Sequence, residues 1–137
     1  MSITLDTKRI PYDTLKPDEN LTDFLSFCRD VKMRYEGNAR ETEEKEDELQ
    51  DLEHWAELHD DLDCKGGYAI YKKIREARRD RRKCKSENEL LYPLYDWVNR
   101  NEKALNALAQ VLGRVRETAE VIDSRKYTAR TNVLEGG

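Results

Sequence analysis

The chain has 137 residues, of which 39% are charged and 37% are apolar. An ordinary globular domain is about 25% charged, so this composition predicts one domain with a narrow core. It favours long helices that each bury one stripe over a compact α/β layer structure. The formal net charge of −4 neither requires nor excludes nucleic acid, because both signs occur in large blocks.

Membrane insertion and secretion find no support in the sequence. No run of about 18 apolar residues exists to span a bilayer, and the start of the chain lacks the apolar stretch of a secretory signal. The three cysteines Cys28, Cys64 and Cys84 are an odd number spaced far apart, unlike a secreted disulfide framework. We expect a cytoplasmic protein without membrane contact, in which Cys28 and Cys84 are small buried residues.

The first half of the chain predicts an arm followed by one long helix. Residues 1–16 contain Pro11 and a short apolar alternation, which indicates an extended N-terminal arm. Pro17 and Asp18 then favour a helix start, and apolar residues at three- and four-residue steps predict a helix over about 18–58. Asn38 and Lys45 interrupt this stripe, so a kink or a polar layer is expected between residues 37 and 45.

The second half predicts two more helices. Aspartates and two glycines in residues 59–67 indicate a turn, and the apolar steps resume over about 67–98, with a break or kink expected near Pro93. Asn99 or Asn101 is a candidate N-cap for a third helix over about 102–124. Residues 125–137 lose the period and predict an extended or mobile tail. The predicted fold is all-α: a three-helix antiparallel bundle, residues 17–124, built on a long charged helical hairpin with extended arms.

Two charged blocks set the predicted register of the hairpin. Residues 41–53 carry a local balance of −7, and residues 72–85 carry +7. If the glycine turn pairs the two helices, residues whose numbers sum to about 126 lie opposite one another. The blocks then face each other, and Arg81 points into the seam. We expect a structural polar layer in which Arg81 bonds Glu41, Glu44 or Glu48 and fixes the register more than it stabilises the fold.

The same blocks supply the candidate binding surface. The acidic helix is expected to neutralise much of the basic run, which leaves Arg75, Arg79 and Arg82 as the best candidates for a free basic face. Trp55, Tyr68 and Tyr71 lie near the turn; they pack in the core or, where exposed, form a partner-binding patch. The candidate partner-binding residues are Arg75, Arg79, Arg82, Trp55, Tyr71, Glu44 and Glu48.

No motif for catalysis or cofactor binding is recognisable. His54 and His59 are five residues apart and do not match a zinc helix motif, and no glycine-rich phosphate loop occurs. Glu41 with Glu44, and Glu120 with Asp123, give the E-x-x-E and E-x-x-D spacings of magnesium-dependent nucleotide hydrolases, but such spacings are common in acidic helices. The predicted protein is not an enzyme and has no cofactor or catalytic residue.

Residues 51–94, DLEHWAELHDDLDCKGGYAIYKKIREARRDRRKCKSENELLYPL, together with RKYTAR at residues 125–130, carry a resemblance. They resemble small helical proteins of unknown function encoded by phages and prophages of Gram-positive bacteria, a setting that includes anti-CRISPR proteins. The resemblance implies a non-enzymatic protein that works by binding a host target. The function that we expect is inhibition of a bacterial defence nuclease or sensor by direct binding inside the host cell. The alternative is a nucleic-acid-binding accessory protein that uses the basic face. The first long helix is longer than the third helix can cover, so part of its apolar stripe is expected to stay exposed. A homodimer that covers this part is a further hypothesis.

Overall fold

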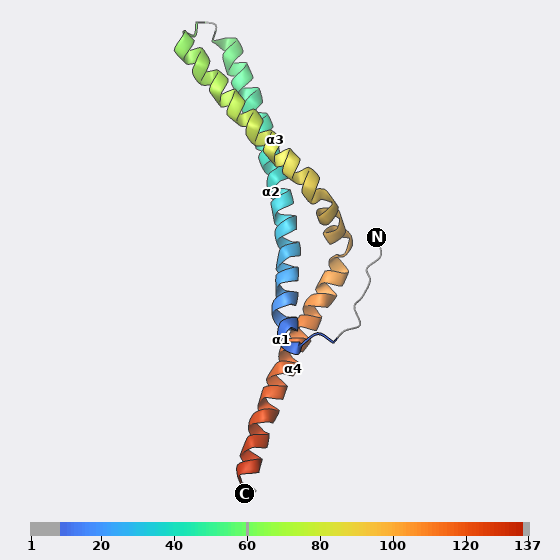
Figure 1. The fold of residues 1–137 in the computed structure, drawn as a ribbon. Coiled ribbons are helices and arrows are strands. Elements are labelled where there is room, and N and C mark those ends of the chain that lie inside the picture. The colour runs from blue at the N-terminus through green and yellow to red at the C-terminus, as the bar shows by residue number, and fades with distance from the viewer. Residues whose placement is uncertain (1–8, 60, 136–137) are drawn as a thin grey trace. The chain divides into compact units, whose positions relative to one another are not determined.

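The computed structural model describes residues 9–59 and 61–135, with side chains described as far as residue 125. The described residues form four helices and no strand: α1 (Tyr12–Leu15), α2 (Pro17–Leu58), α3 (Cys64–Arg100) and α4 (Glu102–Glu135) (Figure 1). The all-α class and the three long helices are therefore confirmed. The chain divides into two compact units, Met1–Phe27 with Asn101–Gly137, and Cys28–Arg100.

The end of the predicted N-terminal arm is helical, not extended. Residues 1–8 lie outside the described part of the chain. Pro11 opens the single turn α1, because its carbonyl oxygen accepts bonds from both the backbone N–H and the hydroxyl of Thr14. Lys16 has φ 42°, in the left-handed region, and this separates α1 from α2. The predicted start of the long helix is confirmed, since α2 begins at Pro17 with Asp18 and Glu19 in its first turn.

The helix after the turn begins earlier than the glycines suggest. α3 starts at Cys64, and its first turn includes Gly66, whose backbone N–H donates to Asp63 Oδ1 at 2.7 Å. Asp63 therefore acts as the N-cap, which satisfies a donor that the start of the helix leaves unpaired. At the other end, α3 runs without interruption through Pro93 to Arg100. Of the two predicted alternatives at Pro93, a break or a kink, the break does not occur.

The last helix is longer than the sequence period indicates. Asn101 precedes α4, and its carbonyl oxygen accepts the N–H of Leu105 at 2.9 Å, as expected for a residue at the N-cap. The helix continues to Glu135, so the prediction of an extended tail from residue 125 is wrong. Residues 125–135 contain neither glycine nor proline, and without a breaker the helix propagates even where its apolar stripe has ended.

In the second unit, α2 and α3 form an antiparallel hairpin whose register is the predicted one (Figure 1). Asn38 bonds Asn88, Lys45 pairs with Asp80, Arg81 pairs with Glu46 and Cys84 bonds Glu41. Each pair stays within one residue of that register. The buried apolar residues of this unit are Cys28, Val31, Ala77, Cys84 and Val98. Small side chains dominate this seam, so the core is narrow, as the composition predicts.

In the first unit, α4 contacts the start of α2 through Arg116 (Figure 1). Leu112 of α4 is buried. Beside it, Arg116 binds the first turn of α2: its Nε and Nη2 atoms donate to the Asp18 carboxylate at 3.0–3.1 Å, and Nη2 also donates to Thr22 Oγ1. This ion pair lowers the pKa of Asp18. It fixes the N-terminus of α2 against α4.

Candidate interaction site on the helical hairpin

A polar cluster lies in the seam of the hairpin where the apolar stripe of α2 is interrupted. Asn38 is only 4% exposed, and its Nδ2 atom donates to Glu87 Oε1 at 3.0 Å and to Asn88 Oδ1 at 2.9 Å. Asn88 in turn donates to the carbonyl oxygen of Tyr35. Arg34 holds the Glu87 carboxylate from the side through Nε and Nη2. The predicted polar layer therefore exists, centred on Asn38.

These donors set the ionisation of Glu87. The bond from Arg34 is the largest cause and the bond from Asn38 the next, and together they lower the pKa of Glu87 from 4.5 to about 2. A carboxylate that accepts several bonds is stabilised in its charged form. Glu87 is therefore ionised at neutral pH and holds both Arg34 and Asn38 in one arrangement, which links α2 to α3 at a defined level.

The predicted partner of Arg81 is wrong. Arg81 Nε donates to Glu46 Oε1 at 2.9 Å, not to Glu41, Glu44 or Glu48. The register places Arg81 opposite Lys45, and like charges at the seam turn the two side chains to opposite flanks. Lys45 contacts Glu48 at 3.2 Å and Asp80 at 3.7 Å on one flank of the seam. Arg81 turns to the other flank, where it contacts Glu46.

Glu41 has a different role from the predicted one. It accepts a bond from the Cys84 thiol at 3.3 Å. Burial of this thiol, with the adjacent Glu41 carboxylate, raises the pKa of Cys84, and burial alone raises that of Cys28. Both cysteines are buried, as predicted, and Cys64 is exposed. The two buried thiols therefore stay protonated at neutral pH and serve as small core residues.

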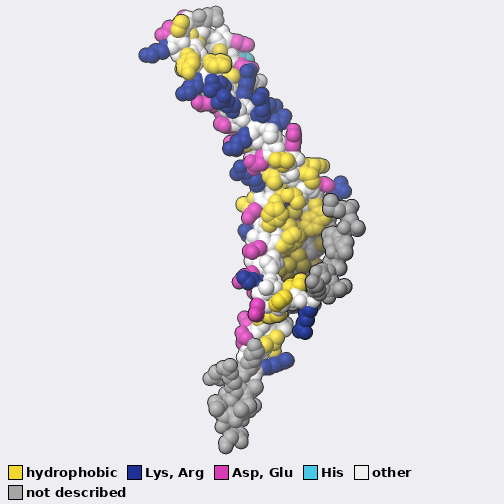
Figure 2. Space-filling model, in the orientation of Figure 1, with side chains coloured by type: hydrophobic (Ala, Val, Ile, Leu, Met, Phe, Trp, Pro, Cys, Tyr) yellow, Lys and Arg dark blue, Asp and Glu magenta, His cyan; other side chains and the backbone are white. Residues whose placement is uncertain are grey.

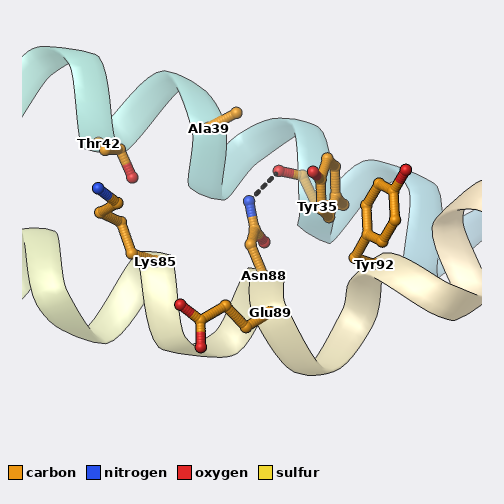
Figure 3. A pocket seen from close by; sticks show the side chains of 7 residues that line it. All are labelled: Tyr35, Ala39, Thr42, Lys85, Asn88, Glu89 and Tyr92. Atoms are coloured by element: carbon orange, nitrogen blue, oxygen red, sulfur yellow. Dashed lines mark hydrogen bonds between the residues drawn. The ribbon is translucent and has the colours of Figure 1, made fainter.

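A groove opens beside the polar cluster, between α2 and α3. Its volume is about 400 Å³, and Figure 3 shows Lys85 extending toward Thr42 and the ring of Tyr92 beside Tyr35. Tyr35 also stacks on Tyr95, with ring centroids 3.9 Å apart. The full lining is Tyr35, Ala39, Thr42, Lys85, Asn88, Glu89 and Tyr92. Two polar lining groups of this groove are already bonded within the hairpin, because Asn88 donates to the carbonyl oxygen of Tyr35 and Thr42 donates to that of Asn38.

The acidic face of α2 forms a second groove, of about 490 Å³. It contains two of the predicted partner-binding carboxylates, Glu44 and Glu48, together with Trp55. Trp55 is 40% exposed and its ring stacks on His59 at 4.0 Å. Glu48 is engaged by Lys45, whereas no ion pair reaches the other carboxylates of the groove within the described residues. The complete lining is Glu44, Asp47, Glu48, Asp51, Leu52 and Trp55.

The basic block of α3 is neutralised less than the sequence predicts. Only Arg78, with Glu53, and Arg81, with Glu46, pair with the acidic helix among the residues that the structure describes. Arg75, Arg79 and Arg82 are exposed, and none has an ion pair within residues 9–59 and 61–125. Figure 2 shows the resulting concentration of Lys and Arg side chains on the hairpin. These three arginines therefore form an exposed basic face on α3.

The aromatic residues near the turn do not form one cluster. Trp55 contacts His59, while Tyr68 and Tyr71 of α3 are 67% and 59% exposed. The core-packing interpretation is wrong for these two tyrosines, because they lie on a side of α3 away from the buried seam residues Ala77 and Cys84. The structure thus separates the predicted partner-binding residues into an acidic groove with Trp55 on α2 and a basic face with Tyr71 on α3.

No group of three or more His, Cys, Asp or Glu side chains suited to a metal ion occurs in the described part of the chain. The two acidic pairs of the hydrolase pattern fall in different compact units, Glu41 and Glu44 in one and Glu120 and Asp123 in the other. None of the described helices is both long and apolar enough to cross a membrane.

Comparisons with known proteins give no match: no family model, no curated protein and no solved structure is significantly similar to this chain. The functional argument therefore rests on the surfaces of the hairpin. Sequence reasoning missed two features of these surfaces. Asp47 and Asp51 belong to the acidic groove, and Asn88 completes the polar cluster. The register of the hairpin placed Asn88 opposite Asn38 and could have identified it.

Proposed function

We propose that this chain is a non-enzymatic, phage-type interaction protein that inhibits a bacterial defence system, in the manner of an anti-CRISPR protein, by binding a host nuclease or sensor directly. The acidic groove of α2 is its contact surface. The observation that carries this proposal is the exposed row of carboxylates Glu44, Asp47 and Asp51 beside the half-exposed ring of Trp55.

The chemistry of this row fits a basic partner. The three carboxylates recur at steps of three and four residues, so they lie on one side of α2. They have no ion pair among the described residues, so their charge is available to a partner. A surface of this kind complements a nuclease channel that normally holds nucleic-acid phosphates. Trp55 at the end of the row supplies the aromatic anchor that dominates many interfaces.

The resemblance of residues 51–94 to phage and prophage proteins supports the biological setting. This segment includes the end of the acidic groove, the turn and the basic block of α3. It also accounts for the expected location inside a bacterial host cell. The acidic groove of α2 and the basic face of α3 are both exposed on one hairpin. This exposure supports the proposal that the protein works by contact with other macromolecules.

The test is a plaque assay in bacteria that carry an active defence system such as a CRISPR nuclease. Expression of the wild-type chain is expected to restore phage growth in the defended host. The triple variant Glu44→Gln, Asp47→Asn, Asp51→Asn is expected to lose this effect. The matched control, Glu117→Gln, Glu120→Gln, Asp123→Asn, removes the same charge from exposed positions of α4 and is expected to keep it.

A pull-down identifies the target. The tagged chain is incubated with lysate of the defended host, with and without nuclease treatment, and the same defence protein is expected in both samples for the wild type and the control. Equal recovery of that protein by the acidic-groove variant would refute the assigned surface. Failure of the wild-type chain to restore phage growth against any of a panel of defence systems would refute the function.

A further inference from the structure

The basic face of α3 continues into the two exposed tyrosines. Tyr68, Tyr71, Arg75, Arg79 and Arg82 follow one another at steps of three, four, four and three residues, which places them along one side of the helix. We call these five residues the tyrosine–arginine stripe. Its ends are 14 positions apart, which corresponds to about 21 Å of helix. The stripe therefore combines aromatic rings at one end with guanidinium groups at the other.

The stripe points away from the seam of the hairpin. The seam residues Ala77, Arg81 and Cys84 contact α2 or are buried, and at about 100° per residue the stripe lies roughly 145° around the helix from them. All five side chains are exposed. No ion pair of the three arginines and no ring contact of the two tyrosines occurs within the described residues.

The nearby carboxylates leave the charge of the stripe largely intact. Glu46 and Glu53 on α2 are engaged by Arg81 and Arg78, and Asp80 is engaged by Lys45. Of the two carboxylates within the basic block, Glu76 and Asp80, only Glu76 lacks an ion pair to a described residue. Lys72 and Lys83 are exposed on the same outer side of α3 and add to its positive charge.

We propose that the tyrosine–arginine stripe binds single-stranded nucleic acid. Arginine remains charged under all physiological conditions and donates in a planar fork that suits phosphate oxygens. Exposed tyrosine rings stack on unpaired bases, and this combination of a basic track with aromatic platforms is the general solution for binding single strands. A duplex keeps its bases stacked on one another and offers nothing to the rings. An acidic peptide would engage the arginines alone.

This surface is distinct from the acidic groove of α2, so the inference goes beyond the proposed inhibitory function and does not depend on it. The two surfaces carry opposite charge, and each has variants that leave the other unchanged. A result on one surface therefore leaves the argument for the other standing.

The test is fluorescence anisotropy of the full chain with a labelled 20-nucleotide oligothymidylate and with a labelled 20-base-pair duplex, at salt concentrations from 25 to 200 mM. Binding of the single strand is expected, with preference over the duplex. Three arginine–phosphate contacts predict that the logarithm of the association constant falls with that of the salt concentration with a slope of about −2. Unlabelled polyglutamate is expected to compete poorly.

Variants separate the two halves of the stripe. Arg75→Gln, Arg79→Gln and Arg82→Gln together are expected to remove most of the salt dependence and the binding. Tyr68→Leu and Tyr71→Leu are each expected to weaken binding roughly 5-fold or more without changing the salt slope. Arg40→Gln, at an exposed arginine of α2, and Tyr12→Leu, at an exposed tyrosine of α1, are the matched controls.

Several results would overturn the proposal, and the first two need only the wild-type chain. One is the absence of binding at 25 mM salt. Another is duplex bound as tightly as the single strand, or polyglutamate competing as well as the oligonucleotide, which would indicate a general anion surface or an acidic protein partner. Unchanged binding by the triple arginine variant, with helical content confirmed by circular dichroism, would place the contact elsewhere.

Discussion

The buried amide of Asn38 is the single polar group on which the hairpin seam depends most, and Asn38→Ala tests this. The substitution removes the two bonds that Nδ2 donates, to Glu87 Oε1 and Asn88 Oδ1. A hydrogen bond contributes a net 0.5–1.5 kcal/mol in typical mutational series, so the loss of two costs about 1–3 kcal/mol. Alanine returns up to about 0.7 kcal/mol through its higher helix propensity.

The assay is urea denaturation at pH 7 followed by circular dichroism at 222 nm. Asn106→Ala is the control, because Asn106 is exposed in α4 and its side chain has no hydrogen bond to another described residue. It carries the same gain in helix propensity without the loss of buried bonds. The free energy of unfolding of Asn38→Ala is expected to lie about 1–3 kcal/mol below that of Asn106→Ala.

A double-mutant cycle with Asn88→Ala makes the test specific. Asn38 and Asn88 share one bond, so the cost of the double substitution is expected to be smaller than the sum of the two single costs. If Asn38→Ala is as stable as Asn106→Ala, the polar cluster does not hold the hairpin together. If the two costs add fully, the bond between Asn38 and Asn88 contributes nothing.

Three further predictions concern pH, backbone and thiols. Because the pKa of Glu87 is lowered from 4.5 to about 2, its contribution to stability is complete above about pH 4.5 and is lost as the pH falls toward 2. Glu87→Gln is therefore expected to flatten the dependence of the free energy of unfolding on pH in this range. Superimposable profiles for the variant and the wild type would contradict this prediction. Gly113→Ala is expected to raise the free energy of unfolding by about 0.5–1 kcal/mol, because a Cβ at this position meets nothing within 4 Å. Gly66→Ala is expected to gain less, because its Cβ would lie 3.0 Å from Leu62 Cδ2. Equal shifts of the melting temperature in the two variants would refute this distinction. Cys64 is exposed while Cys28 and Cys84 are buried with raised pKa values, so at pH 8 a thiol reagent is expected to modify one cysteine quickly in the native protein, and fast modification of all three would show that the seam opens.

The hairpin could be predicted from sequence because two independent signals agree on it. The glycine turn fixes where the chain reverses, and the apolar steps fix which sides of the helices meet, so the register follows. The ends of the helices were harder to predict. A lost apolar period suggested a tail after residue 124, but α4 continues to Glu135. An apolar period shows which side of a helix is buried. A helix that is exposed on all sides does not need such a period, so its end cannot be located from the loss of the period.

The polar contacts could be predicted in position but not in partner. The interrupted stripe located the polar layer near Asn38, yet the choice among several glutamates for Arg81 depended on side-chain directions. Arg81 and Lys45 face each other and turn to opposite flanks, toward Glu46 and toward Glu48 with Asp80. A helical wheel gives the angle of each Cα position and does not include this repulsion between neighbouring side chains.

The opposite charges of α2 and α3 invite the interpretation that the two helices simply neutralise each other, but the geometry argues against it. Within the described residues only two of the basic side chains of α3 reach the acidic helix, because a hairpin with a narrow seam brings together only the flanks of its helices, and their outer sides stay apart. Exposed pairs of this kind contribute little, roughly 0.2–1 kcal/mol each. The adhesion of the hairpin therefore comes from the small apolar seam and the Asn38 cluster. The outer charges are consequently free to be changed for function without loss of the fold, which is why charge variants of either outer face are expected to keep full helical content while they alter binding.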